Sequence, residues 1–130
     1  MELMLPPAPM GNAAFAWYSL KRDNTVVYTR AFSYPREFAD AVKKVEQKLG
    51  DQVIRIRYSL DYDSTGDPAV HFRIVMPDSS LTKGKLLENT RHVSFVIEQE
   101  LKPEELWGVN PYFRFRSESE QEKMQEPIWA

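Results

Sequence analysis

Residues 53–76 read VIRIRYSLDYDSTGDPAVHFRIVM, and this stretch decides the fold. On either side of its centre, apolar and polar residues alternate, which is typical of a β-strand with one buried face. The centre, residues 63–68, is rich in Asp, Ser, Gly and Pro, the residue types that form turns. The stretch therefore predicts two antiparallel strands joined as a β-hairpin, with their even-numbered apolar residues buried.

Helical patterns precede and follow this hairpin. Before it, apolar residues recur at three- and four-residue spacing over residues 38–49, with Ser33 as the predicted N-cap and Pro35 in the first turn. After it, Asp78, Ser79 and Ser80 offer N-caps for a longer helix, with Gly84 in its first turn and apolar residues on one side from Leu86 to Leu101. Residues 112–116 alternate again and predict a short final strand.

The region before the first helix contains two further strand patterns, at residues 15–20 and 25–32. With the second of these as a strand, the element order is β-α-β-β-α-β. We therefore predict an α+β fold of ferredoxin-like (split βαβ) order, in which two helices cover one face of an antiparallel sheet. An alternative keeps the helix-hairpin-helix-strand core and places residues 13–32 elsewhere.

Length and composition restrict the function classes. The chain has 130 residues, and we expect a flexible proline-rich tail at residues 1–12 followed by a single domain at residues 13–130. Its net charge of −2 excludes a global field that draws it to nucleic acid or anionic lipid. The absence of cysteine excludes disulfides and thiol catalysis, and it fits a cytoplasmic protein. Pro6, Pro7 and Pro9 interrupt the longest uncharged stretch, so no membrane span is expected.

The predicted strands carry basic residues on the face opposite the helices. The candidate binding residues on that face are Arg55, Arg57, His71, Arg73, Tyr112, Arg114 and Arg116. Arginine presents a planar fork of donors that suits carboxylate or phosphate, so an anionic partner is expected. A protein with acidic groups is favoured over a nucleic acid, because RNA-binding sheets carry exposed aromatic residues on their central strands and this one carries arginines.

Neutralisation of the basic face within the chain, or in a homodimer, is the competing interpretation, because arginines on neighbouring strands repel one another. The acidic residues downstream of the last strand are Glu118, Glu120, Glu122 and Glu126. Beyond them, Ile128 and Trp129 are expected to dock onto the body of the protein or onto a partner.

The hairpin turn carries a second candidate cluster, which consists of Asp61, Asp63, Thr65 and Asp67. Its aspartate pair resembles the nucleophile loop of haloacid-dehalogenase-like phosphotransferases, but those enzymes need a doubly wound domain rather than a hairpin. Its alternate spacing resembles a calcium loop, but the position of the bidentate glutamate falls on Phe72. We therefore expect these side chains to hydrogen-bond the backbone of the turn, with Gly66 at positive φ.

No catalytic residue, metal ligand or cofactor is assigned from the sequence. His71 and His92 lie apart from any nucleophile motif, and no base is placed beside Ser117 or Ser119. The spacing of Ser119 and Glu122 instead predicts a capping box at the start of a short last helix.

Two blocks of the chain together resemble a family of small bacterial proteins whose function is not established. The blocks are residues 63–75, DSTGDPAVHFRIV, and residues 111–121, PYFRFRSESEQ. The similarity covers roughly residues 35–130 and implies no activity. It implies that the threonine-glycine-aspartate turn and the Phe-Arg-Ser stretch act together.

These observations predict a non-enzymatic protein-interaction or regulatory domain of a bacterial cytoplasmic system, which uses the arginine-rich sheet face. The expected partner is another protein or a second copy of the chain. The alternatives are a metal- or nucleotide-dependent enzyme at the aspartate turn, and nucleic-acid binding by the sheet face.

Overall fold

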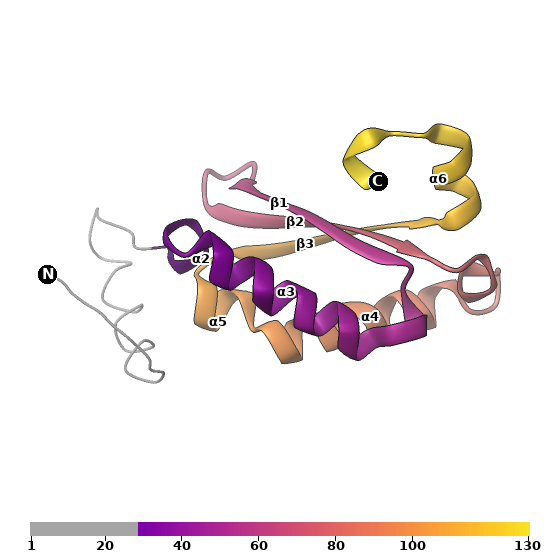
Figure 1. The fold of residues 1–130 in the computed structure, drawn as a ribbon, viewed down its shortest axis with the longest axis horizontal. Helices are drawn as coiled ribbons and strands as arrows, with labels where there is room; N and C mark the ends of the chain where they lie inside the picture. Colours follow the sequence, from indigo (N-terminus) through magenta and orange to yellow (C-terminus); the bar gives the residue numbers. More distant parts are fainter. Residues whose placement is uncertain (1–28) are drawn as a thin grey trace, which may run out of the picture.

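Three strands form a sheet at the centre of the fold, and helical segments lie on both sides of it (Figure 1). The structure is a computed structural model that describes residues 29–130. Its elements are α2 (Arg30–Ser33), α3 (Pro35–Leu49), η1 (Gly50–Gln52), β1 (Arg55–Tyr62), β2 (Pro68–Met76), η2 (Asp78–Leu81), α4 (Leu86–Leu101), α5 (Pro103–Trp107), β3 (Asn110–Ser117), α6 (Glu118–Met124) and η3 (Pro127–Trp129). The described part of the chain is therefore of the α+β class, as the patterning predicts.

β1 and β2 form the predicted antiparallel hairpin. Their register pairs Arg55 with Val75 at one end and Tyr62 with Pro68 beside the turn. The even-numbered residues that the sequence assigns to the core are buried along β2, as Phe72 is, and at Ile56 on β1. The prediction is wrong for Ile54, which lies just before β1 and is 40% exposed.

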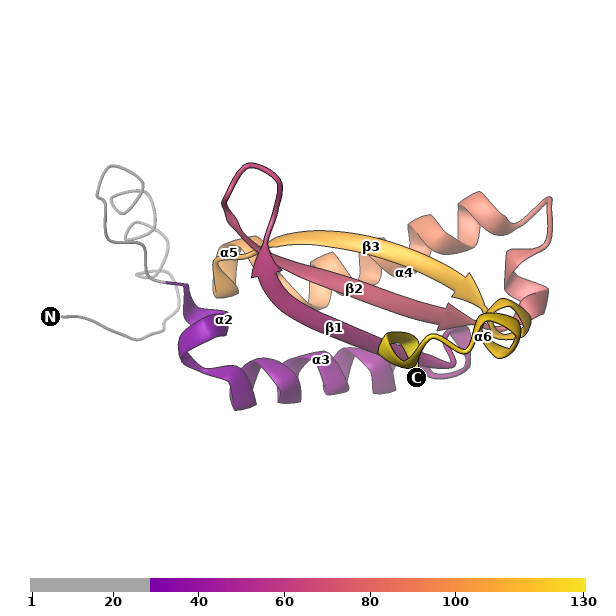
Figure 2. The same ribbon diagram turned by 90° about the horizontal axis from the view of Figure 1, so that it is seen from above.

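The third strand contradicts the predicted topology. β3 pairs with β2 in parallel, with Phe113 opposite Phe72, so the sheet is mixed and its order is β1-β2-β3. The predicted ferredoxin-like order β-α-β-β-α-β with an antiparallel sheet is therefore wrong. The reason is visible in Figure 2: α4 and α5 carry the chain back along the sheet, so β3 starts at the same end as β2. It then pairs with β2 directly, whereas a split βαβ unit leaves another strand between them.

The predicted tail and most of the two N-terminal strand patterns lie outside the described residues. Where prediction and structure overlap, Arg30–Ser33 form α2 rather than the end of a strand. Ala31 is fully buried, and the ring of Phe32 packs edge-on against the ring of Tyr62 at 5.6 Å. Tertiary packing therefore overrides the β-propensity of this short stretch. Within residues 29–130, the element order agrees with the alternative helix-hairpin-helix-strand core.

A proline separates α2 from α3. Pro35 takes the first position of α3, as predicted, where its missing N–H leaves no donor unpaired. Tyr34 adopts φ −126° and ψ 66°, because a following proline disfavours the helical region. Tyr34 is therefore the N-cap of α3, and the predicted N-cap Ser33 lies inside α2 instead.

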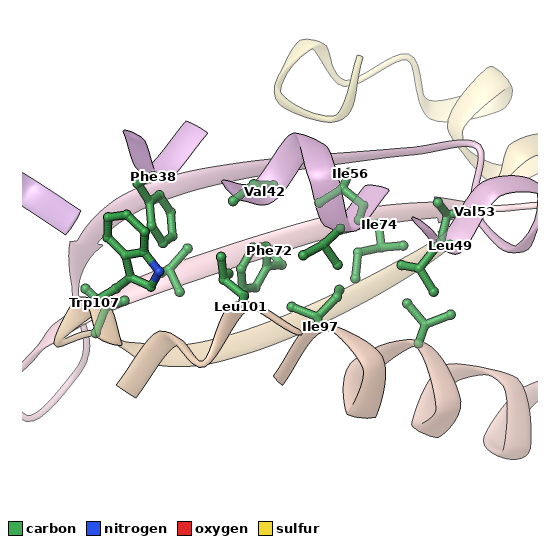
Figure 3. Packing of buried hydrophobic residues seen from close by; sticks show 14 of the residues in the cluster. Phe38, Val42, Leu49, Val53, Ile56, Phe72, Ile74, Ile97, Leu101 and Trp107 are labelled. Carbon is green, nitrogen blue, oxygen red and sulfur yellow. The ribbon is translucent and has the colours of Figure 1, made fainter. Parts of the chain in front are cut away.

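The main core lies between the sheet and the two long helices (Figure 3). The buried residues are Phe38, Val42, Val45 and Leu49 on α3, and Val93, Ile97 and Leu101 on α4. At one end of this core, the ring of Phe38 meets the rings of Tyr58 and Trp107 edge-on, at 5.2 and 5.1 Å. Each large apolar side chain buried in this way stabilises the fold by about 1.5–3 kcal/mol.

Gly50 follows the last residue of α3 at φ 55° and ψ −123°, a backbone conformation that only glycine adopts readily. Nothing lies within 4 Å of the position that a Cβ atom takes there, so any strain is conformational. We expect Gly50→Ala to lower the free energy of unfolding by about 1–3 kcal/mol, measured by urea denaturation. The matched control is Gly84→Ala, whose Cβ also meets open space at a residue without positive φ. The control should raise stability by about 0.4–1 kcal/mol or leave it unchanged, and equal losses in the two variants contradict the prediction.

Candidate functional site

The sheet face opposite α3 and α4 carries the seven residues that the sequence singles out, and we call it the arginine-rich face. Its members are Arg55, Arg57, His71, Arg73, Tyr112, Arg114 and Arg116. Register aligns them in rows across the strands, with Ser59 beside His71 and Tyr112 in one row, and with Arg55, Val75 and Arg116 in another. The row between these two consists of Arg57, Arg73 and Arg114. Figure 2 looks onto this face.

Arg73 occupies the centre of the three-arginine row and is only 7% exposed. Its Nε donates to the carbonyl oxygen of Ile128 at 3.1 Å, and its Nη1 donates to Oγ of Ser59 at 3.1 Å. Burial, followed by the positive charge of Arg114, lowers the pKa of Arg73 from its ordinary value. The guanidinium nevertheless stays charged, because arginine keeps its proton at all pH values relevant to proteins. A buried charge is tolerated only with such hydrogen bonds.

The C-terminal residues fold back over one end of the face (Figure 1). Three arginine side chains donate to the main-chain oxygens of three consecutive residues: Arg73 to Ile128, Arg55 to Trp129 and Arg57 to Ala130, at 3.1, 2.9 and 2.8 Å. Charge-assisted hydrogen bonds of this kind are roughly twice as strong as neutral ones. The arginines are therefore partly satisfied by carbonyl dipoles of their own chain.

The expected neutralisation by downstream glutamates occurs at one position in the described residues. Glu126 pairs with Nη2 of Arg116 at 2.7 Å, while Glu120 caps a helix. Within residues 29–130 the other ion pair joins Lys48 and Glu100 on the helix side. No acidic side chain in this range therefore forms an ion pair with Arg57, Arg73 or Arg114.

Trp129 anchors the C-terminal segment and docks onto the body of the protein, as predicted, whereas Ile128 is 56% exposed and does not. Trp129 is 3% exposed, and the guanidinium of Arg116 lies 4.2 Å from the centre of its ring. Gln121 beside it is buried, accepts from Arg116 at 3.0 Å and donates to the carbonyl oxygen of Glu126 at 3.0 Å. The sequence pattern does not single out Gln121 as a site residue, because nothing local marks a glutamine as buried.

The remaining part of the face is open, with Arg114 exposed and Tyr112 43% exposed. Arg57 at the edge of the covered part is also exposed, although it donates to the main-chain oxygens of Ala130 and Ile56. The ring of Tyr112 stacks on the ring of His71, with centroids 5.4 Å apart and an interplanar angle of 17°. An approaching ligand therefore meets two guanidinium groups and one flat aromatic pair.

The aspartate turn is organised around one carboxylate. Oδ1 of Asp63 accepts from the N–H and the hydroxyl of Thr65, at 3.0 and 2.6 Å, and from the N–H of Asp67 at 3.0 Å. Oδ2 accepts from Nδ2 of Asn110 at 3.3 Å and from the hydroxyl of Tyr112 at 2.9 Å. These hydrogen bonds, with that from the Thr65 side chain the largest, hold the pKa of Asp63 well below its usual range. The same contact with Asp63 raises the pKa of Tyr112.

These contacts use both oxygens of Asp63 inside the fold and tie the turn to the first residues of β3. The turn thus contacts residues 111–121 at Tyr112, not at the Phe-Arg-Ser residues further along the strand. Asp61, for its part, accepts from the N–H of Tyr62 at 2.8 Å. In the described range, no group of three His, Cys, Asp or Glu side chains is placed to hold a metal ion.

A cleft of about 490 Å³ lies at the opposite end of β3, and the sequence does not predict it. Its lining residues are Asp78, Leu81, Leu86, Phe115, Ser117, Ser119 and Glu120. Asp78 accepts hydrogen bonds from the N–H and the hydroxyl of Ser119, and these bonds lower the pKa of Asp78. These hydrogen bonds tie the start of α6 to the residues that follow β2.

The capping box of the last helix differs from the predicted one. Ser117 accepts from the N–H of Glu120, and the Glu120 side chain accepts from the N–H of Ser117. The predicted pair, Ser119 with Glu122, is two residues too late, because β3 ends at Ser117 and α6 starts directly after it.

Comparisons of the chain with protein-family models, with curated proteins and with solved structures found no match. Among the described residues, no helix has both the length and the apolar character needed to cross a bilayer. A function for this protein is therefore argued from the geometry of the arginine-rich face itself.

The lowered pKa of Asp63 makes stability depend on pH in a defined direction. In an unfolded chain an aspartate titrates near pH 3.9, so the ionised carboxylate stabilises the fold above about pH 4, and this contribution is lost as pH falls below that value. We expect Asp63→Asn to reduce the free energy of unfolding most at pH 7, and the gap to wild type to shrink toward about pH 3. Urea denaturation at the two pH values measures the gap.

Tyr112→Phe removes one of the five hydrogen bonds to Asp63 and serves as the graded comparison. It should weaken the pH-dependent part of the stability without abolishing it. A gap between wild type and Asp63→Asn that is equal at both pH values contradicts the role assigned to the Asp63 carboxylate.

Proposed function

We propose that this protein is a non-enzymatic interaction module of the cytoplasm, which binds an acidic segment of another protein on its arginine-rich face. The observation that carries the proposal is the row formed by Arg57, Arg73 and Arg114. Within residues 29–130 no acidic side chain forms an ion pair with this row, and its two outer members are exposed. Adjacent like charges on neighbouring strands are destabilising, so an anionic ligand relieves a repulsion that the fold leaves in place.

The chemistry of the face favours carboxylate groups on a polypeptide. An arginine fork binds a carboxylate through two parallel hydrogen bonds. At the covered end, Arg55, Arg57 and Arg73 already bind main-chain oxygens, so the spacing of their donors suits a polypeptide backbone. Nucleic acid is less well served, because on this face the central strand presents the half-buried His71 and the buried Arg73 rather than a row of exposed aromatic rings.

The geometry supports an enzyme at the aspartate turn less well than it supports a binding protein. Both oxygens of Asp63 accept hydrogen bonds within the fold, five in all. To bind a metal ion or take part in a reaction on a phosphate, this carboxylate would have to lose several of these bonds. His71 stacks on Tyr112 beside this turn, and the hydroxyl of Ser59 on the neighbouring strand accepts a hydrogen bond from Arg73. A binding role uses the observed arrangement without change.

Charge reversal at the two exposed arginines tests the proposal. A fluorescein-labelled oligoglutamate peptide is titrated into the wild type and into the double variant Arg57→Glu/Arg114→Glu, with fluorescence anisotropy as the readout. We expect the double variant to bind about tenfold or more weakly, because two contacts worth up to about 1 kcal/mol each become repulsive. Circular dichroism confirms that both proteins are folded.

The matched control is Arg36→Glu/Arg91→Glu, which changes the net charge equally at exposed positions on α3 and α4. It should bind the peptide nearly as well as the wild type. Equal losses in the two double variants mean that only net charge matters, and they overturn the proposal. Tighter binding of a labelled oligouridylate with a steep salt dependence assigns the face to nucleic acid instead.

A further inference from the structure

The C-terminal residues 126–130 lie on the arginine-rich face in the manner of a bound peptide. Three of the polar contacts that hold them go to main-chain oxygens, from Arg55, Arg57 and Arg73. Such contacts do not depend on the side chains of the bound segment, so another polypeptide in the same position receives the same three hydrogen bonds. The donors of Arg55, Arg57 and Arg73 are therefore spaced to bind the main chain of an extended segment, as they bind that of the C-terminal residues.

Two side chains of the segment supply its specific contacts. Glu126 pairs with Arg116 at 2.7 Å, and the ring of Trp129, three residues later, lies against the same guanidinium at 4.2 Å. Trp129 is 3% exposed, whereas Ile128 between them is 56% exposed. The specific contacts of the segment thus come from an acidic residue and from an aromatic residue three positions later, and Arg116 contacts both.

We propose that the arginine-rich face is a docking site for a partner protein's segment with this pattern, an acidic residue followed three positions later by an aromatic one, and that residues 126–130 occupy the site until such a segment replaces them. This deepens the proposed function, on which it rests, by naming the chemistry of the partner. The exposed Arg114 extends the site toward further acidic residues of the partner.

Replacement of the C-terminal segment leaves the main core intact. The helix-side core cluster contains neither Trp129 nor Val75, the buried residue of β2 that faces the C-terminal side. The segment is joined to α6 through Gln125, which adopts the left-handed conformation at φ 49° that a non-glycine residue rarely takes. Glu126 is about half exposed, so its ion pair with Arg116 is also accessible to water and contributes little to stability.

Because the C-terminal segment is tethered, we expect a free peptide to compete poorly with it in the wild-type chain. A segment on a short connection acts at an effective concentration on the order of millimolar. Micromolar peptide therefore gains access only when the tethered segment is weakened. Substitutions of Glu126 or Trp129 weaken the contacts of the tethered segment and leave every arginine of the site in place.

The test uses a fluorescein-labelled synthetic peptide with the sequence of residues 118–130 and the full-length chain. Anisotropy titrations compare the wild type with Glu126→Gln and Trp129→Ala. We expect saturable binding that is a few fold tighter for Glu126→Gln than for wild type, and at least about tenfold tighter for Trp129→Ala, in line with the contacts removed. A peptide with its Trp replaced by Ala is the control and should bind no variant tightly.

Arg116→Gln added to the Glu126→Gln chain should abolish binding, because Arg116 contacts both specific side chains. Glu126 is a surface residue, so the Glu126→Gln arm remains informative even where Trp129→Ala lowers stability. Absence of peptide binding to folded Glu126→Gln and Trp129→Ala chains overturns the inference.

The oligoglutamate probe separates the two proposals. If the variants bind oligoglutamate but not the peptide, the site takes acidic segments without the aromatic pattern, and only this inference fails. If neither probe binds, the proposed function fails as well. Concentration-dependent dimerisation of Glu126→Gln in sedimentation velocity assigns the site to a second copy of the chain and overturns the choice of a separate partner.

Discussion

The position of β2 is the constraint on which the rest of the structure depends. It is the middle strand, so its backbone pairs along both edges while its side chains alternate between two layers. Phe72 and Ile74 enter the core beneath α3 and α4, whereas Arg73 and Val75 face the other way and are covered by the C-terminal segment. A slip of one residue would exchange the two sets and place a guanidinium in the apolar core, so pairing and burial enforce one register.

Three arginines in adjacent positions create a repulsion that the described residues moderate without an ion pair to an acidic side chain. Arg73 at the centre is buried and bonded to a carbonyl oxygen and a hydroxyl, and Arg57 bonds to the main-chain oxygen of Ala130. Hydrogen bonds to charged groups contribute about 1.5–3 kcal/mol each, but carbonyl dipoles orient around a positive charge without cancelling it. The net positive charge of the row therefore stays on the face, which is the physical basis for an acidic partner.

β3 has one neighbouring strand among the described residues, and two carboxylates hold its ends. Asp63 of the hairpin turn binds Asn110 and Tyr112 where the strand begins, and Asp78 binds Ser119 just after it ends. Both carboxylates have a lowered pKa because they accept several hydrogen bonds each. Charged anchors at the two ends thus position the strand that carries Arg114 and Arg116, so the geometry of the face depends on residues that lie outside it.

Alternation along residues 53–76 is enough to predict the hairpin, its turn and the face on which Arg55, Arg57 and Arg73 lie, because period-two patterning and turn chemistry are local properties of a chain. The spacing of apolar residues predicts α3 for the same reason. The direction of β3 is not local: its alternation suits a parallel or an antiparallel neighbour equally well, and the return path through α4 and α5 selects the parallel one. Only the tertiary structure shows that Trp129 covers part of the face. Its contact with Arg55 joins residues 74 positions apart, and the local sequence around one of them does not indicate the position of the other.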